Sequence, residues 1–142
     1  ANLSLLAWPD VPKRAYGEVA AALRPALASA RIPKFAWTEG DLFEAELWLL
    51  NDSPRRLPPG RVEARLRFGE EETFLLDWDH GEVPANENLP GPVVRFRLGR
   101  REAGRMTLLL RAGGGGERDS RYVLLYAPAS AADTDATRPL NA

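Results

Sequence analysis

Cysteine is absent from the chain of 142 residues, which excludes disulfide bonds, thiol catalysis and cysteine-based zinc sites. Histidine occurs once, so a catalytic triad or a histidine-based metal site would have to be built around His80. There is no run of about 18 apolar residues that could cross a membrane as a helix, and residues 1–10 lack the basic and long apolar stretches of a signal peptide. These absences predict a soluble protein, with the bacterial cytoplasm and secretion both open as locations.

Lysine is also scarce, since only Lys13 and Lys34 carry this side chain among the 19 Lys and Arg residues. Charges of the two signs nearly balance at a formal net charge of −1, with 27% of residues charged. The chain therefore has no field strong enough to gather phosphate backbones or anionic lipids over its whole surface. Nucleic acid and membranes are not expected as partners.

Apolar residues alternate with polar ones through much of the chain, as the two-residue period of a half-buried strand requires. Phe43, Leu47 and Leu49 face one way in the expected strand at 42–50, and a second strand at 61–69 repeats the pattern. Further strands are expected at 26–30, 34–37, 72–79, 94–98, 106–110 and 122–126. In the strand at 72–79, one face should carry Phe74, Leu76 and Trp78.

Residues 58–60, 90–92 and 113–116 are rich in Pro or Gly and are predicted to be connections between strands. A short helix is predicted at residues 10–24, because Asp10 can cap it, Pro12 suits its first turn and Pro25 ends it. The sequence therefore predicts an all-β fold, an immunoglobulin-like antiparallel β-sandwich of about 7–8 strands with one short N-terminal helix. The expected divisions are an N-terminal segment at 1–25, the sandwich at 26–128 and a flexible tail at 129–142, where the apolar period is lost.

Few residues are suited to chemistry. Asp77, Asp79 and Glu82 are weak candidates for calcium ligands, because hard cations favour carboxylates, but their spacing is not that of a calcium-binding loop. The acidic cluster at 70–72 is expected to be solvated, not to form the carboxylate pair of a glycosidase, and the glycines at 113–116 lack the Lys-Ser or Lys-Thr of a phosphate-binding loop. We predict no catalytic residue, no metal and no cofactor, and interpret His80 as a strand end entering a turn.

Aromatic side chains are the candidates for binding, because their flat faces stack on sugar rings. Of the four tryptophans, Trp48 is unusual, since it shares the strand side of Glu44 and Glu46 instead of the apolar side. It is either an exposed aromatic or an anchor covered by another element such as the helix. We favour the covered anchor, because large exposed aromatics usually mark interfaces.

Four segments carry a resemblance to a known family: KRAY at 13–16, LRPAL at 23–27, EGDLFEA at 39–45 and LLNDS at 49–53. In this order they resemble the junction between the catalytic barrel and the C-terminal sandwich domain in glycoside hydrolase family two, especially its β-mannosidase-like members. The family has Pro where Arg14 stands and Glu where Asp41 stands. The resemblance extends over residues 10–127 and includes no catalytic residue.

The resemblance implies a non-catalytic accessory domain from the C-terminal part of a retaining, exo-acting glycoside hydrolase that removes terminal β-linked sugars. Alone the chain would be inactive, and its partners would be the catalytic barrel and sugar-binding domains of the same parent chain. Trp8, Tyr16 and Val19 would make that contact, and Trp48 and Trp78 are further candidates for sugar or interface contact. An independent carbohydrate-binding module and an immunoglobulin-like protein-interaction domain remain alternatives.

Overall fold

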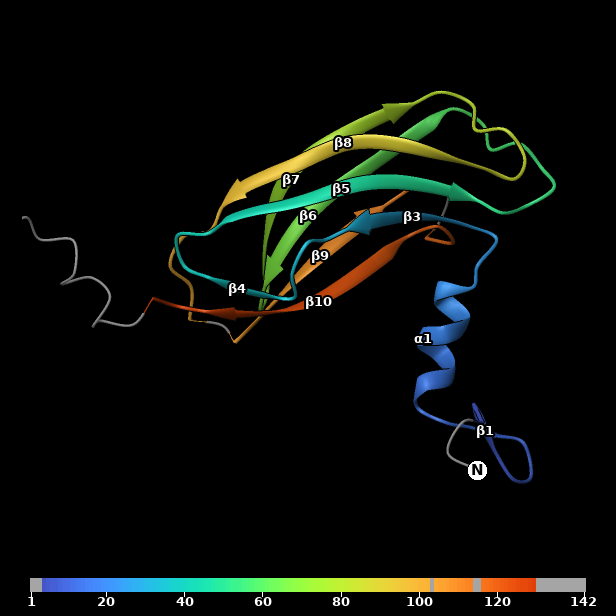
Figure 1. Cartoon of the computed structure of the whole chain (residues 1–142), viewed down its shortest axis with the longest axis horizontal. Coiled ribbons are helices and arrows are strands. Elements are labelled where there is room, and N and C mark those ends of the chain that lie inside the picture. The colour runs from blue at the N-terminus through green and yellow to red at the C-terminus, as the bar shows by residue number, and fades with distance from the viewer. Residues whose placement is uncertain (1–3, 103, 114–115, 130–142) are drawn as a thin grey trace, which may run out of the picture.

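Two β-sheets face one another in the computed structural model, which describes residues 4–102, 104–113 and 116–129 (Figure 1). One sheet has five strands, in the order β4 (Ala36–Thr38), β10 (Ser120–Ala127), β9 (Arg105–Arg111), β6 (Gly60–Phe68) and β7 (Glu71–His80). The other has three, in the order β3 (Ala26–Arg31), β5 (Leu42–Asn51) and β8 (Glu87–Arg97). Neighbouring strands are antiparallel in the described part, except that β4 runs parallel to β10. The predicted all-β sandwich is confirmed.

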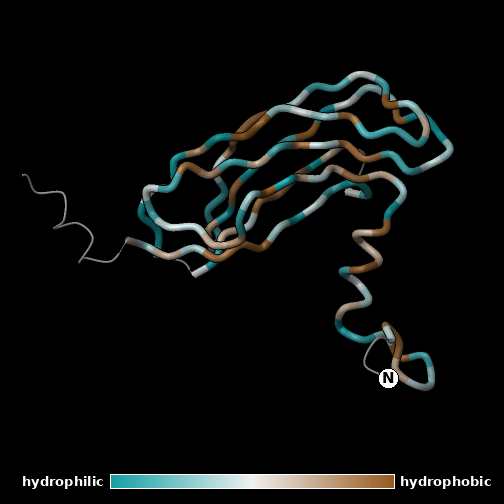
Figure 2. Tube along the Cα trace, viewed as in Figure 1, coloured by the Kyte–Doolittle hydropathy of each residue, from teal (hydrophilic) through white to brown (hydrophobic). Residues whose placement is uncertain are grey.

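The core lies between the inward faces of the two sheets. The alternation in β5 places Phe43, Leu47 and Leu49 there with no exposed surface, and Figure 2 shows hydrophobic and hydrophilic residues alternating along the strands. Burial of each large apolar side chain contributes about 1.5–3 kcal/mol, which holds the sheets together. Other strands and two loops supply further fully buried side chains, namely Val62, Leu66, Val83, Val94, Leu98, Met106, Leu108, Leu110 and Leu124.

The N-terminal segment differs from the prediction. It forms a hairpin and a shorter helix, made of β1 (Leu6–Ala7), β2 (Val11–Pro12) and α1 (Ala15–Ala22). Asp10 does not cap the helix, because its amide donates to the Ala7 carbonyl at 2.8 Å across the hairpin turn and its φ is 89°. Pairing with β1 keeps residues 11 and 12 extended, so the helix begins later and, as predicted, ends before Pro25. The described part thus holds ten strands, more than the predicted total of about 7–8.

Figure 1 shows the hairpin and α1 outside the sandwich, joined to it at the start of β3. The helix has eight residues and none of them is buried. Within the described residues, no helix is long and apolar enough to span a membrane.

Residues 90–92 lie inside β8, so the predicted connection there is wrong. Glu46 of β5 is opposite Val93, whereas Trp48 is opposite Pro90, which gives β8 one residue more than β5 over this stretch. Such a bulge leaves a residue unpaired, and β8 is an edge strand, where a missing proline N–H is tolerated. The predicted connection at 113–116 does join β9 to β10, with Gly113 at φ 63° and Gly116 at φ 88°; residues 114 and 115, and the predicted tail from 130 onwards, are outside the described residues.

A second bulge corrects the predicted face of β7. Ala64 is opposite Leu76, but its neighbour Arg65 is opposite Phe74, so Leu75 is an extra residue. Leu76 and Trp78 pack against the core, whereas Phe74 is turned to the outward face and is 50% exposed. The guanidinium of Arg65 lies over its ring at 5.7 Å from the centroid.

The free edge of β3 is covered by groups from the start of β10 and from the loop before it. The amide of Ala28 donates to the carbonyl of Arg118 at 2.9 Å, and the amide of Ala30 donates to the hydroxyl of Tyr122 at 3.1 Å. Edge strands with unpaired amides invite pairing with other chains. Tyr122 therefore both closes this side of the sandwich and protects its edge.

Replacing Tyr122 with Phe should lower the free energy of unfolding by about 1 kcal/mol, because the amide of Ala30 loses its acceptor while the ring remains. Urea unfolding followed by circular dichroism measures the change. Tyr16→Phe is the matched control, since that side chain is 44% exposed on α1. Equal losses for the two variants would show that the Tyr122 hydroxyl does not stabilise the edge.

Candidate functional site

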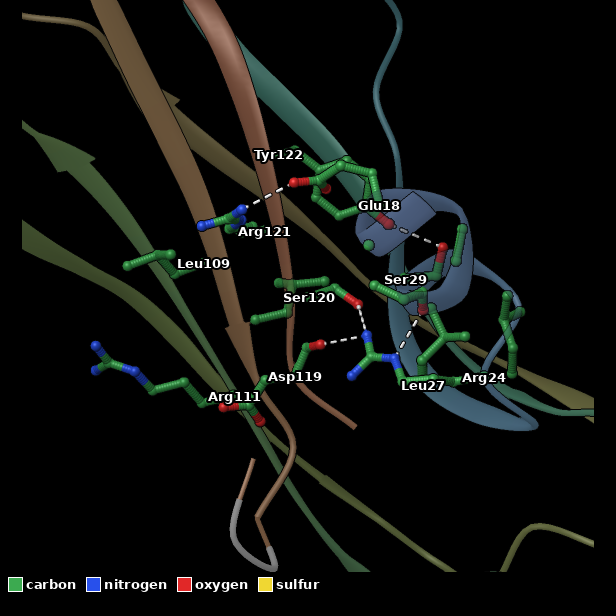
Figure 3. Close-up of a pocket in the computed structure, with 15 residues that line it drawn as sticks. Glu18, Arg24, Leu27, Ser29, Leu109, Arg111, Asp119, Ser120, Arg121 and Tyr122 are labelled. Atoms are coloured by element: carbon green, nitrogen blue, oxygen red, sulfur yellow. Dashed lines mark hydrogen bonds and ion pairs between the residues drawn. The ribbon is translucent and has the colours of Figure 1, made fainter. Parts of the chain in front are cut away.

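A crevice of about 760 Å³ opens where α1 meets the end of β9 and the start of β10. Figure 3 shows its labelled side chains coming from the helix, from the start of β3 and from β9 and β10. The helix contributes small residues, Gly17, Ala21 and Ala22, and Leu27 and Leu109 add apolar surface. The helix thus lies beside the sandwich, and its small side chains leave the crevice between helix and sandwich open.

Arg24 joins the helix to the sandwich. Its guanidinium donates to the carbonyl oxygens of Glu117 at 2.7 Å and Asp119 at 2.5 Å, and its Nε donates to that of Ala21 at 2.7 Å. One side chain therefore holds the end of α1 against the connection between β9 and β10. Arg24 lies in the second resembling segment, and no local pattern indicates its long-range partners.

A second link between α1 and the sandwich is an ion pair. Glu18 accepts from Arg121 at 2.9 Å, and the two side chains are 72% and 65% exposed. Exposed pairs contribute little, about 0.2–1 kcal/mol. Of these two links, the hydrogen bonds of Arg24 therefore contribute more.

The projecting N-terminal segment carries three of the residues singled out from the sequence. Trp8 is 95% exposed in the hairpin turn, Tyr16 is 44% exposed, and Val19 is half-buried on α1. Val11 and Leu23, which were not singled out, are also exposed, at 56% and 76%. The segment thus presents several large apolar side chains that its own sandwich does not cover.

Trp48 and Trp78 are not brought together. Trp48 is half-buried on the outward side of the three-stranded sheet, opposite Ser29 and Pro90. Trp78 belongs to the other sheet and packs against the core, with its ring close above Gly91. The two tryptophans do not form a common flat platform.

The weak calcium candidates are engaged with arginines. Arg61 donates to Asp79 at 2.7 Å and to Asp77 at 3.3 Å, and Arg56 donates to Glu82 at 2.7 Å. No group of three or more potential metal ligands gathers within the described residues. His80 ends β7 as a buried side chain whose Nδ1 lies 2.8 Å from the Gly81 carbonyl oxygen.

Two carboxyl groups have lowered pKa values. The pKa of Asp41 is lowered by its hydrogen bond to Lys34, at 2.6 Å, and then by the one from the Thr38 amide at the open edge of β4. The pKa of Glu63 is lowered chiefly by hydrogen bonding to Arg65 and further by Arg111. Both carboxylates thus stabilise the folded chain in their charged form.

Stability should fall in acid because of these two groups. Their ordinary pKa values are 3.8 for Asp41 and 4.5 for Glu63; since the folded values lie lower, the stabilisation is complete above the ordinary values and is lost as the pH falls through the folded ones. Urea unfolding between about pH 6 and pH 2.5 measures this slope. Asp41→Asn should flatten it, whereas Glu102→Gln, at an exposed position, should not. An unchanged slope in Asp41→Asn would contradict the assignment.

Comparison with known proteins supports the fold. No family model matches the chain, and no curated protein matches it. The CARDB domain of the PF1109 protein from Pyrococcus furiosus, solved in complex with di-metal ions, has a TM-score of 0.53 at 10% identity over 73% of this chain and 94% of that one. At this identity the likeness shows a shared fold alone.

Two other solved structures are more distant. Spo0M, a sporulation control protein from Bacillus subtilis, has a TM-score of 0.45 at 12% identity, over 72% of this chain and 49% of that one. AvmM, which catalyses macrocyclization in alchivemycin A biosynthesis, has a TM-score of 0.48 at 9% identity, over 76% and 93%. The two facing sheets, together with the likeness to the CARDB domain, define the class of this chain as an all-β sandwich domain.

Proposed function

We propose that this chain is a non-catalytic accessory domain that packs, through its N-terminal segment, on the catalytic barrel of a retaining, exo-acting glycoside hydrolase of the β-mannosidase or β-galactosidase kind. The observation that carries the proposal is the projecting segment, with Trp8 at 95% and Leu23 at 76% exposure. Large exposed apolar groups of this kind mark interaction surfaces. A domain interface within one chain buries about 600–1,500 Å², which a hairpin and a two-turn helix can supply.

The finer fold belongs to the same proposal. We assign the sandwich to the immunoglobulin-like class, because the first strand of the sandwich, β3, pairs in one sheet while its successor β4 pairs beside the last strand in the other. Strands that change sheets and two antiparallel layers are features of that architecture.

The four resembling segments also support a scaffolding origin, since their polar residues make structural contacts. Arg24 holds the helix end, Asp41 accepts from Lys34 and the Thr38 amide, and Asn51 binds two loops together. The two hydrolytic glutamates of such an enzyme would lie in the barrel of the parent chain. The present chain would stiffen the assembly or complete the rim of its cleft.

The test compares the isolated chain with the parent protein. The complete reading frame should encode a barrel with two glutamates at strand ends before Ala1, and hydrogen exchange at residues 5–23 should slow at least about tenfold in the parent. Trp8→Ala should restore fast exchange there, and Tyr122→Phe should leave it slow. Absence of a barrel, or equal exchange in the two proteins, would overturn the proposal.

A carbohydrate-binding module is the second candidate, favoured by the outward position of Trp48. Titration of the chain with manno-, gluco- and galacto-oligosaccharides distinguishes it, because an accessory domain should bind none of them. Saturable binding that Trp48→Ala abolishes would replace the first proposal with this one. If the chain binds no sugar and the reading frame encodes no barrel, the immunoglobulin-like protein-interaction domain is favoured.

A further inference from the structure

The outward face of the five-stranded sheet combines exposed apolar and arginine side chains across three strands. Val123 of β10 is opposite Thr107 of β9, which is opposite Arg67 of β6. The adjacent row has Leu125 opposite Arg105. Residues directly opposite in a sheet share a face, so these five residues form one patch, which we call the β10 patch. Val123 and Leu125 are each 58% exposed, whereas Thr107 between the two arginines is buried and Arg67 is half-buried.

Arg67 and Arg105 differ from the other arginines of this face. Arg61, Arg65 and Arg111 each bind a carboxylate, within 3.3 Å. In the described part of the chain, no hydrogen bond, ion pair or ring contact joins the side chain of Arg67 or Arg105 to another residue. The acid opposite Arg67 is Glu72, and its carboxylate is taken by Arg111 at 3.0 Å. The patch therefore has two cations whose charges its own sheet does not neutralise.

We infer that the β10 patch binds a protein segment that presents carboxylates beside apolar side chains. The exposed Val123 and Leu125 offer the apolar contact, and Arg67 and Arg105 offer charge and hydrogen bonds at its border. Protein interfaces are enriched in arginine and have a more apolar buried core, and arginine binds carboxylates through paired N–H donors. No residue of this patch belongs to the N-terminal segment, which meets the same face at the neighbouring Arg121, so the inference goes beyond the proposed function.

The amount of free charge favours a protein over a lipid surface or a nucleic acid. Anionic membranes attract clusters of about 4–8 basic residues, and nucleic acid binding neutralises a row of phosphates. Only Arg67 and Arg105 are uncompensated in this patch, and the chain as a whole has a net charge of −1. Two cations beside two apolar groups fit a short acidic and apolar stretch of protein.

A peptide probe tests the inference. The peptide Glu-Ser-Leu-Ser-Leu-Ser-Glu places its leucines and glutamates on one side when extended, and its counterpart with Lys for Glu is the charge control. Titrated into the labelled chain, the acidic peptide should shift the amide resonances of Thr107, Val123 and Leu125 saturably. Arg105→Ala and Arg67→Gln should each weaken binding at least about fivefold, whereas Arg55→Ala, an exposed arginine far along the chain, should not.

Several results would overturn the inference. One is that the peptide shifts only amide resonances outside the patch, and another is that the Lys peptide binds equally well. A third is that the chain does not bind the peptide but binds phosphatidylserine vesicles or oligonucleotides in a manner that needs Arg105. A fourth is that the chain forms a dimer that Val123→Ser dissociates. Thermal melting of each variant shows whether it is folded. Val123→Ser tests the apolar contact separately from the arginines, because it removes an apolar side chain of the patch. Trp8→Ala should leave peptide binding unchanged, so a failure of the proposed function and a failure of this inference are distinguishable.

Discussion

Replacing Asn51 with Asp should lower the free energy of unfolding by about 3 kcal/mol, the largest change that we expect from a polar substitution in this chain. Asn51 has no exposed surface. Its Nδ2 donates to the carbonyl oxygens of Arg55 and Pro84, each at 2.8 Å, and its Oδ1 accepts from the hydroxyl of Ser53 at 2.7 Å. A carboxylate has the same shape but no donor, so two carbonyl oxygens that now accept hydrogen bonds would face a negative charge.

The position of Asn51 makes this loss global. The loop after β5 and the loop after β7 meet here, where Leu57 and Val83 exchange two backbone hydrogen bonds of 2.9 and 3.0 Å. The amide of Asn86 also donates to the carbonyl of Ser53 at 3.1 Å. Asn51 is the side chain that connects both loops to the end of a central strand, so its replacement loosens one whole end of the sandwich.

Urea unfolding at neutral pH measures the loss in Asn51→Asp, and Asp52→Asn is the matched control. Asp52 is the exposed neighbour, and within the described residues its only hydrogen bond runs from its backbone amide to the carbonyl of Pro25 at 2.7 Å. Its replacement should change stability by less than about 0.5 kcal/mol. The deficit of Asn51→Asp should shrink in acid, because a protonated carboxyl can donate one hydrogen bond. Equal, small effects at both positions would contradict the role assigned to Asn51.

The elements predicted correctly are those with a strong local signal. β5 keeps the two-residue period over its ten residues and β6 over eight of its nine, and burial of one face leaves them a single register. The errors at residues 10–12 and 90–92 have another origin. Turn-forming residues there join a hairpin or an edge strand only because a partner strand lies beside them, and pairing across the sheet is not visible in a local pattern.

The site shows the same division between local and long-range signals. Trp8, Tyr16 and Val19 were identified as apolar residues ahead of the sandwich, and they lie on the projecting segment, but what covers them stays a prediction. The role of Arg24 is not predictable from a local pattern, because its partners, Glu117 and Asp119, are more than ninety residues away. The β10 patch is likewise not predictable from a local pattern, because the register of three strands brings its residues together.

Gly91→Ala should lower the free energy of unfolding by about 2 kcal/mol, because the added methyl group would overpack the side of the sandwich. A Cβ at this position would lie 2.6 to 2.8 Å from three carbon atoms of the Trp78 ring. That ring packs against the core and lies 5.8 Å from the ring of His80. The conflict is thus with a rigid, partly buried indole, and either the ring or the bulge in β8 must move.

A double-mutant cycle identifies the cause. If the ring is responsible, Gly91→Ala should cost much less in a Trp78→Leu background, with an interaction energy of about 1 kcal/mol or more, because the smaller side chain leaves space for the methyl group. Near-ultraviolet circular dichroism should change in Gly91→Ala, since the indole is displaced. Gly81→Ala is the matched control, because a Cβ there has nothing within 4 Å. If Gly91→Ala costs the same with and without the indole, the strain lies in the backbone of the bulge, and the close approach of β8 to β7 is not what requires glycine.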